Sequence, residues 1–176
     1  MLARIYSNPI LAAAGDITSD GAVTVTSAGG TTTSGDITTT GDALQFASVT
    51  TLGGAQDLTI TAGTGNVTFT GAVGTTRLGT FQIVNAGNVN VENVNSDSMT
   101  FSAQNIQTGT HNATTANFDA AADINAISVT ANSANLKAGQ AIVNARIVAI
   151  NVTVQGTDSI SLINTTADGF WEEDMH

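Results

Sequence analysis

Apolar and polar residues alternate one by one along most of this chain, and that alternation constrains the fold more than any other feature. Examples are Val23-Thr-Val-Thr, Leu58-Thr-Ile-Thr, Val67-Thr-Phe-Thr and Ile150-Asn-Val-Thr-Val. Residues two apart lie on the same face of an extended strand, whereas a helix needs a period near 3.6. Because each run is short and is bounded by Gly, Asn, Asp or Ser, the sequence predicts an all-β protein made of short strands.

Internal repetition indicates how these strands are arranged. Gly15-Asp-Ile-Thr recurs as Gly35-Asp-Ile-Thr, and Gly65-Asn-Val recurs as Gly87-Asn-Val. This period is too short for a propeller blade or a pair of helices, and it fits one coil of a β-solenoid. The 176 residues therefore predict a single-domain parallel β-helix with about eight coils of about 20–22 residues.

Composition agrees with such a coil and excludes other classes. Charged residues make up only 10% of the chain, so Thr, Asn, Ser and Gln must supply most of the polar surface. These residues favour strands and turns, which argues against a helical bundle. A hydrophobic fraction of 41% with a single proline argues against intrinsic disorder.

Three stretches depart from the alternation. Residues 112–126, which include Asp119-Ala-Ala-Ala-Asp, could form a short helical turn or a loop. Residues 1–14 and 169–176 are interpreted as capping or docking segments on either side of a solenoid spanning 15–168, because the end coils of a solenoid must be covered or paired. The apolar and aromatic residues of these segments are the candidates for assembly contacts: Leu2, Ile5, Tyr6, Ile10, Leu11, Phe170 and Trp171.

The stretch from Gly54 to Gly74, with Gly35-Asp-Ile-Thr-Thr-Thr-Gly before it, resembles the β-strand repeats of filamentous-haemagglutinin-like bacterial surface proteins. The resemblance covers about residues 15–110. It implies a right-handed parallel β-helix, export to the cell surface or the extracellular space, and a role as an adhesin or a surface fibre. The secretion domain of that family is not recognisable in this chain.

Titratable residues give little sign of catalysis. Asparagine and aspartate suit corners, so five aspartates beside the repeats are expected to be corner residues rather than a catalytic cluster; they are Asp16, Asp20, Asp36, Asp42 and Asp57. The two histidines, His111 and His176, lie far apart in the sequence and are expected to be exposed to solvent. We therefore predict no catalytic residues, no metal site and no cofactor.

Two ligand signatures match the sequence poorly. The nearest match to a calcium-binding nonapeptide, Gly53-Gly-Ala-Gln-Asp-Leu, lacks a glycine and the correct aspartate offset. Thr-x-Thr pairs, which could build an ice-binding array, occur at irregular intervals and become rare after residue 70. Ordinary outward strand positions explain them better.

Charge limits the partners. The formal net charge is −10, and the four basic residues are scattered, so nucleic acid and anionic lipid surfaces should be repelled. No apolar run approaches the roughly 20 residues of a membrane-spanning helix. There is no cysteine, so disulfides and thiolate metal sites are excluded.

The sequence thus predicts a structural, extracellular β-solenoid, either the stalk of a bacterial surface adhesin or the subunit of a filament that assembles head to tail. Self-association is the expected interaction, with a glycan or protein of a host or cell surface as a possible further partner. The alternative is a β-helix that binds or cleaves carbohydrate, and a less favoured one is an ice-binding solenoid.

Overall fold

The computed structural model describes residues 3–7, 11–13, 15–27, 30–46, 49–51, 56–166 and 169–174, and every regular element among them is a β-strand. In chain order the strands are β1 (Ala3–Ser7), β2 (Leu11–Ala13), β3 (Ile17–Ser19), β4 (Val23–Ser27), β5 (Thr31–Thr33), β6 (Ile37–Thr39), β7 (Leu44–Phe46), β8 (Val49–Thr51), β9 (Leu58–Thr61), β10 (Val67–Phe69), β11 (Val73–Asn112), β12 (Thr115–Ala120), β13 (Ile124–Ala138), β14 (Ala141–Gly156), β15 (Ser159–Thr166) and β16 (Gly169–Asp174).

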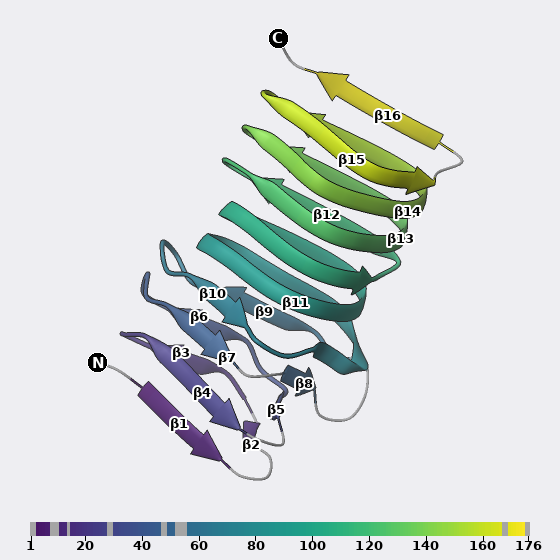
Figure 1. Ribbon diagram of the computed structural model, residues 1–176. Helices are drawn as coiled ribbons and strands as arrows, with labels where there is room; N and C mark the ends of the chain where they lie inside the picture. Colours follow the sequence, from purple (N-terminus) through teal and green to yellow (C-terminus); the bar gives the residue numbers. More distant parts are fainter. Residues whose placement is uncertain are drawn as a thin grey trace.

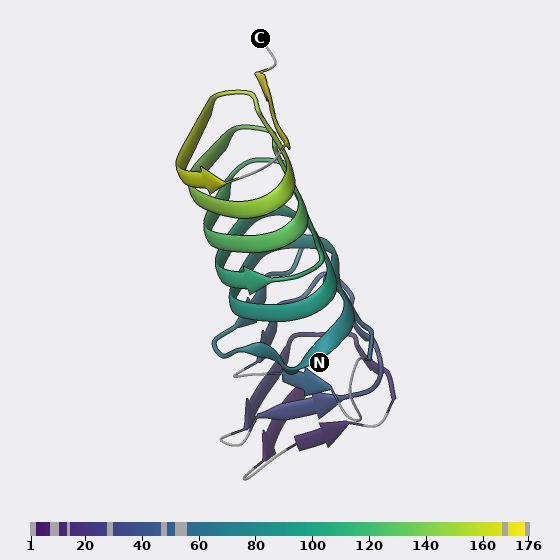
Figure 2. The same ribbon diagram turned by 90° about the vertical axis from the view of Figure 1, so that its right-hand side faces the viewer.

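These strands stack as the three faces of a coil. Face A consists of β1, β4, β7 and β10, face B of β3, β6 and β9, and face C of β2, β5 and β8, with every pairing parallel. Above them β11 and the later strands continue all three faces around the corners (Figures 1 and 2). The predicted parallel β-solenoid is confirmed, with about seven turns.

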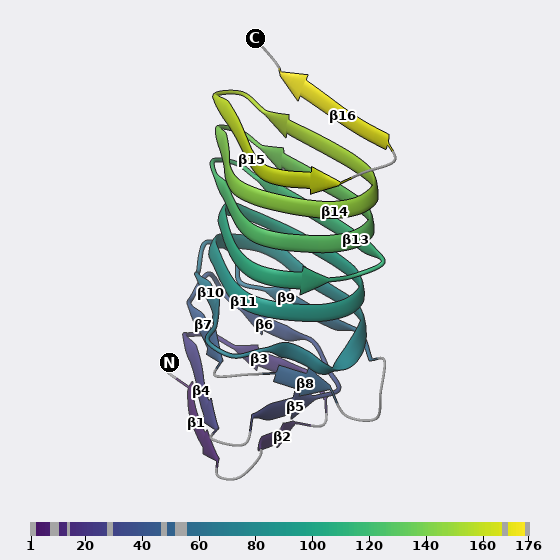
Figure 3. The same ribbon diagram turned by 45° about the vertical axis from the view of Figure 1, so that its right-hand side comes forward.

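The coil is right-handed. In Figure 1 the nearer strands β1, β4 and β7 run from left to right while the chain rises, and the fainter strands of face B return behind them. This is the hand that parallel crossover connections adopt almost without exception. Figure 3 shows the same stack with its corners aligned along the axis.

Coil length changes along the axis. In the first half, Val23 pairs with Leu44, 21 positions on, and Leu44 pairs with Val67, 23 positions on. In the second half the offset falls to 17 between Phe101 and Phe118 and to 18 in the next coil. The coil length expected from the repeats therefore describes the lower coils only, because the glycine-aspartate corners from which it came end where the coils shorten.

The core is a continuous apolar column inside the stack. Inward residues recur in register from coil to coil, as Ile106, Ile124, Ile142 and Ile160 do on face A. Five phenylalanines form a second column: Phe46 stacks on Phe69 at 5.4 Å between ring centroids, and the series continues through Phe81 and Phe101 to Phe118. All five are buried, and each contributes about 1.5–3 kcal/mol of burial free energy.

The stretch expected to be a helical turn or loop is regular strand for most of its length. In β12 the residues Ala116, Phe118 and Ala120 are buried and alternate with outward positions. The alanine run has high helix propensity, but period-two burial of the strand against coils above and below outweighs it. Within the stretch, strand is interrupted only at the corners 113–114 and 121–123.

Both terminal segments continue the coil in their described parts. Strands β1 and β2 pair with β4 and β5, and Ala3 lies in register with Val23. At the other end β16 pairs with β14, and Gly169 lies in register with Asn151. Their backbone therefore follows the same stacking as the solenoid between them. The division of the chain at residues 14 and 168 stays a prediction, because both residues lie outside the described part.

Candidate functional site

The acidic residues singled out in the sequence lie at corners and bind backbone. A carboxylate oxygen of Asp16 accepts a hydrogen bond from the backbone N–H of Asp36 at 3.0 Å, and Asp36 accepts from Thr59 at 2.9 Å. Asp57 accepts from the N–H of Thr80 at 2.7 Å. Each carboxylate thus satisfies a backbone donor of the following coil, which is the structural role expected of a corner residue.

The remaining two aspartates do not join a cluster either. Asp20 accepts a hydrogen bond from the Thr40 hydroxyl at 3.1 Å, and the backbone carbonyl of Asp42 accepts one from Thr39 at 2.7 Å. Within the described ranges, no three metal-ligating side chains come together. Most of the calcium-like segment, residues 53–55, lies outside those ranges.

A second corner carries a ladder of amides. The Asn66 side-chain oxygen accepts from the N–H of Asn88 at 3.0 Å, and the Asn105 amide donates to the Asn88 side chain at 2.8 Å. The ladder continues upward, with Asn105 accepting from Asp123 and Asp123 from Ala141. Sequence reasoning missed this ladder, although the recurrence of asparagine or aspartate once per coil would have revealed it.

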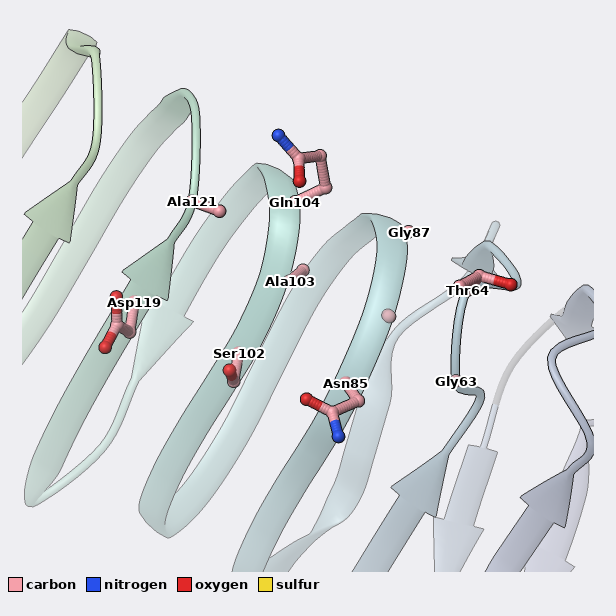
Figure 4. A pocket seen from close by; sticks show the side chains of 10 residues that line it. Gly63, Thr64, Asn85, Gly87, Ser102, Ala103, Gln104, Asp119 and Ala121 are labelled. Carbon is pink, nitrogen blue, oxygen red and sulfur yellow. The ribbon is translucent and has the colours of Figure 1, made fainter.

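A broad concavity lies where the coils shorten, at the corner between faces B and A. We call it the shoulder groove; its volume is about 730 Å³. Its floor is made of small residues from four successive coils: Gly63, Ala86, Gly87, Ala103 and Ala121. Its rim is polar and consists of Thr64, Asn85, Ser102, Gln104 and Asp119 (Figure 4). The groove therefore has an apolar base between polar edges.

The rim of the shoulder groove includes side chains with no hydrogen-bond partner among the described residues. Asn85, Ser102 and Gln104 form no side-chain hydrogen bond within the described part of the chain. Asp119 pairs with Lys137 on the next coil, at 3.5 Å, and both side chains are more than half exposed. Such an exposed pair contributes at most about 1 kcal/mol, so Asp119 remains accessible to a ligand.

His111 is buried inside the stack, which corrects the expectation that it is exposed. Its side chain is 0% exposed, and its ring packs edge-on against Phe101 and Phe118 at 6.1 and 5.6 Å. Neither ring nitrogen has a hydrogen-bond partner in the described part of the chain, and desolvation by burial lowers the pKa of His111 from 6.5 to about 4. The signal that could have placed it is register: His111 pairs with Val129, an inward position of the next coil.

In the same region, the buried hydroxyls of Ser96 and Thr108 also lack hydrogen-bond partners among the residues that the structure describes. Like His111, they belong to the coils near the centre of the chain. These coils thus hold more polar side chains in the core than strand alternation alone predicts.

The predicted assembly residues that the structure describes lie in strands at opposite ends of the stack (Figure 1). Ile5 and Tyr6 are in the lowest coil, in register with Val25 and Thr26, and Leu11 is in register with Thr31. At the upper end Phe170 is in register with Val152, and Trp171 with Thr153. Leu2 and Ile10 lie outside the described residues, as does His176.

The threonine rows do not extend into a continuous array. On face A, Gln45 lies in register between Thr24 and Thr68. On face B, the later coils place Ser102, Asp119 and Lys137 in one outward row. The expectation of outward strand positions is wrong for one Thr-x-Thr pair, since Thr31 and Thr33 are buried on face C. Neither the buried pair nor the interrupted rows match the regular surface that an ice-binding lattice requires.

Comparison of the chain with protein-family models, curated proteins and solved structures finds no match. Among the residues that the structure describes, there is no helix with the length and apolarity that crossing a bilayer requires.

Proposed function

We propose that this chain is a structural β-solenoid of a bacterial cell surface, serving as the stalk of an adhesin or as a filament subunit, and that it associates head to tail. The observation that carries the proposal is the open stacking of both ends. Within the described ranges, the strands of the lowest coil, β1, β2 and β3, pair only with the coil above, and β15 and β16 pair only with β14 below.

The two open ends are complementary in their hydrogen bonding. Inward residues such as Ile17, Leu44 and Ile106 direct their backbone N–H to a carbonyl of the following coil. Thr70, at an outward position, directs its N–H to Phe46 of the preceding coil. The upper edge of one molecule therefore presents the groups that the lower edge of another requires, and stacking the two continues the same parallel ladder.

Such a contact joins two different surfaces, so it does not close on itself. A contact of this type, repeated, gives an open filament rather than a dimer. The repeat style shared with filamentous-haemagglutinin-like surface proteins supports a location outside the cell. The same stacking would join this segment to further coils in a longer stalk.

Electron microscopy and light scattering over a range of protein concentrations test head-to-tail association. We expect rods whose length and mean mass rise with concentration. Arg4 is in register with Thr24 and, through the next coil, with Thr68, and the N–H of Thr70, two positions after Thr68, points to the preceding coil. The N–H of Arg4 therefore points away from the stack. The variant Arg4→Pro removes this N–H and should give short rods. Arg4→Ala keeps that N–H and is the matched control. Monodisperse short rods of the unmodified protein at high concentration would contradict the proposal.

A further inference from the structure

The shoulder groove has the chemical character of a sugar-binding surface. Saccharides present C–H patches on their ring faces and hydroxyl groups at their edges, and each hydroxyl both donates and accepts hydrogen bonds. The glycine and alanine floor offers the first kind of contact. The rim offers the second, since Asn85 and Gln104 carry amides, Ser102 carries a hydroxyl and Asp119 carries a carboxylate.

The rim also repeats along the axis. Ser102 and Asp119 are partners in adjacent coils, and Asn85 precedes them one coil below (Figure 4). Neighbouring strands are about 4.8 Å apart, so polar groups recur at that interval along the groove. A ligand whose own hydroxyl groups recur along a chain matches this arrangement, and an isolated small molecule uses only part of it.

Other classes of ligand fit less well. Binding of an extended peptide by strand addition requires an unpaired strand edge, but the strands of the groove are bonded to coils on both sides. An anionic ligand meets Asp119 and a chain of net charge −10, with the nearby Lys137 already paired to Asp119. The groove thus favours an uncharged, polyhydroxylated chain.

We infer that the shoulder groove binds a neutral oligosaccharide, whose ring faces lie on the alanine and glycine floor and whose hydroxyl groups bond to Ser102, Gln104 and Asp119. This inference goes beyond the structural role and does not depend on it: a filament that binds no sugar and a monomeric rod that binds sugar are both recognisable outcomes. The rim carries no aromatic side chain, so binding is expected to be weak, with a Kd on the order of 0.1–1 mM.

Titration calorimetry and saturation-transfer NMR with the full chain test the inference. The probes are three neutral tetrasaccharides (cellotetraose, maltotetraose and mannotetraose) and an anionic one, tetragalacturonate. We expect saturable binding of at least one neutral probe and none of tetragalacturonate. The double variant Gln104→Ala/Asp119→Ala should weaken the neutral complex about tenfold or more, because each lost hydrogen bond contributes to affinity.

A matched control removes similar groups from another face. Asn112 and Thr130 are exposed register partners on face C, and Asn112→Ala/Thr130→Ala should bind as the unmodified protein does. A second variant, Ser102→Ile, fills part of the groove without removing a charge or adding an aromatic ring, and it should also weaken the neutral complex. Thermal unfolding of each variant shows that the fold is retained.

Three results would overturn the inference. They are the absence of saturable binding by every neutral probe, a preference for tetragalacturonate, and equal affinities of the groove variants and the face C control. If the double variant unfolds, Ser102→Ile still decides the question.

Discussion

The lower coils turn corners on glycine at positive φ, whereas the upper coils turn many of their corners within long strands. Residues with positive φ within the described ranges are all at or before position 85: Gly15, Gly30, Gly41, Gly63, Gly74 and Asn85. The strands of the lower coils are mostly three residues long, and β13 and β14 in the upper coils span 15 and 16 residues. Corners with a positive φ and corners that keep strand geometry therefore both allow the same parallel stacking of coils.

The comparison shows that the backbone conformation at the corners determines how many residues a coil contains. A corner with positive φ reverses the chain sharply and adds turn residues, and the lower coils accordingly reach the long offset that separates Leu44 from Val67 and Leu58 from Phe81. A corner that keeps strand geometry needs fewer residues, which gives the shorter upper coils. The shoulder groove lies at the junction between the two kinds of coil, so the change in coil length is also what shapes the candidate site.

The largest expected effect is the loss of stability when a phenylalanine of the aromatic column is removed from the upper or the lower coils. Phe101 contacts Phe81, Phe118 and His111, whereas Phe46 has one aromatic neighbour among the side chains that the structure describes, Phe69. We expect Phe101→Ala to lower the free energy of unfolding by about 4–5 kcal/mol and Phe46→Ala by about 3 kcal/mol. Urea unfolding followed by circular dichroism measures both losses, and an equal or reversed order would show that the two regions are packed alike.

The second expected effect is a dependence of stability on pH, caused by the buried His111 of the upper coils. Because the pKa of His111 is about 4 in the folded protein and 6.5 as a model value, the unfolded chain binds more protons between these values. Stability is therefore full above pH 6.5 and falls as the pH drops toward 4, by about 3 kcal/mol in total.

Only desolvation shifts this pKa, so replacing the ring with an apolar side chain should remove the dependence. We expect His111→Leu to flatten the profile of unfolding free energy between pH 7 and pH 4, and His176→Asn to leave it unchanged. A profile that persists in His111→Leu would assign the pH dependence to the carboxylates instead.

The third effect separates two reasons why a corner requires glycine, a positive φ in the lower coils and a close approach of backbone in the upper coils. Gly41 has φ of +97°, so Gly41→Ala should lower stability by about 1–2 kcal/mol through backbone strain, with partial recovery in Gly41→Asn. A Cβ at Gly139 would instead strike the carbonyl oxygen of Ala121 in the coil below. Gly139→Ala should cost about 1–3 kcal/mol with no recovery in Gly139→Asn. Recovery by asparagine at both positions would remove the distinction between the regions.

The smallest effect concerns the hydrogen bonds of Arg77 to Asp97 and Asn95, near the junction between the long and the short coils. Arg77 donates from Nε to Asp97 at 2.6 Å and from Nη1 to Asn95 at 2.9 Å, with the arginine and aspartate side chains 36% and 58% exposed. We expect Arg77→Ala to lower stability by less than about 1 kcal/mol, and less in high salt. Urea unfolding at low and high salt measures it, and a salt-independent loss would indicate packing rather than charge.

Much of the fold could be predicted because alternation and spacing are properties of single strands and corners. Val23, Val67 and Phe69 point inward as their alternation predicts, and Asp16 and Asp36 lie at corners as expected of aspartate beside glycine. The shorter upper coils could not be predicted from the glycine-aspartate motif, because those coils have corners of another kind. The 112–126 stretch misleads for a related reason, since local helix propensity says nothing about the coils that bury its inward residues.

The site was less accessible to sequence reasoning than the fold. The shoulder groove is formed by residues such as Thr64, Asn85 and Asp119, which come from separate coils and meet only after the register is fixed. Coil length near residue 90 determines that register, and no motif in the sequence marks it. The burial of His111 depends on the same register, through its pairing with Val129.

The hydrogen bonds that backbone N–H groups donate to corner side chains of another coil share one direction along the chain. In each such bond between coils, from Asp16–Asp36 to Asp123–Ala141, the side-chain acceptor belongs to the earlier coil and the N–H to the later one. A polypeptide that emerges amino end first would thus find acceptors already in place for each new turn. If the coils formed from the carboxyl end instead, each N–H would be in place before its side-chain acceptor. The pattern therefore favours winding of the rod from its amino end.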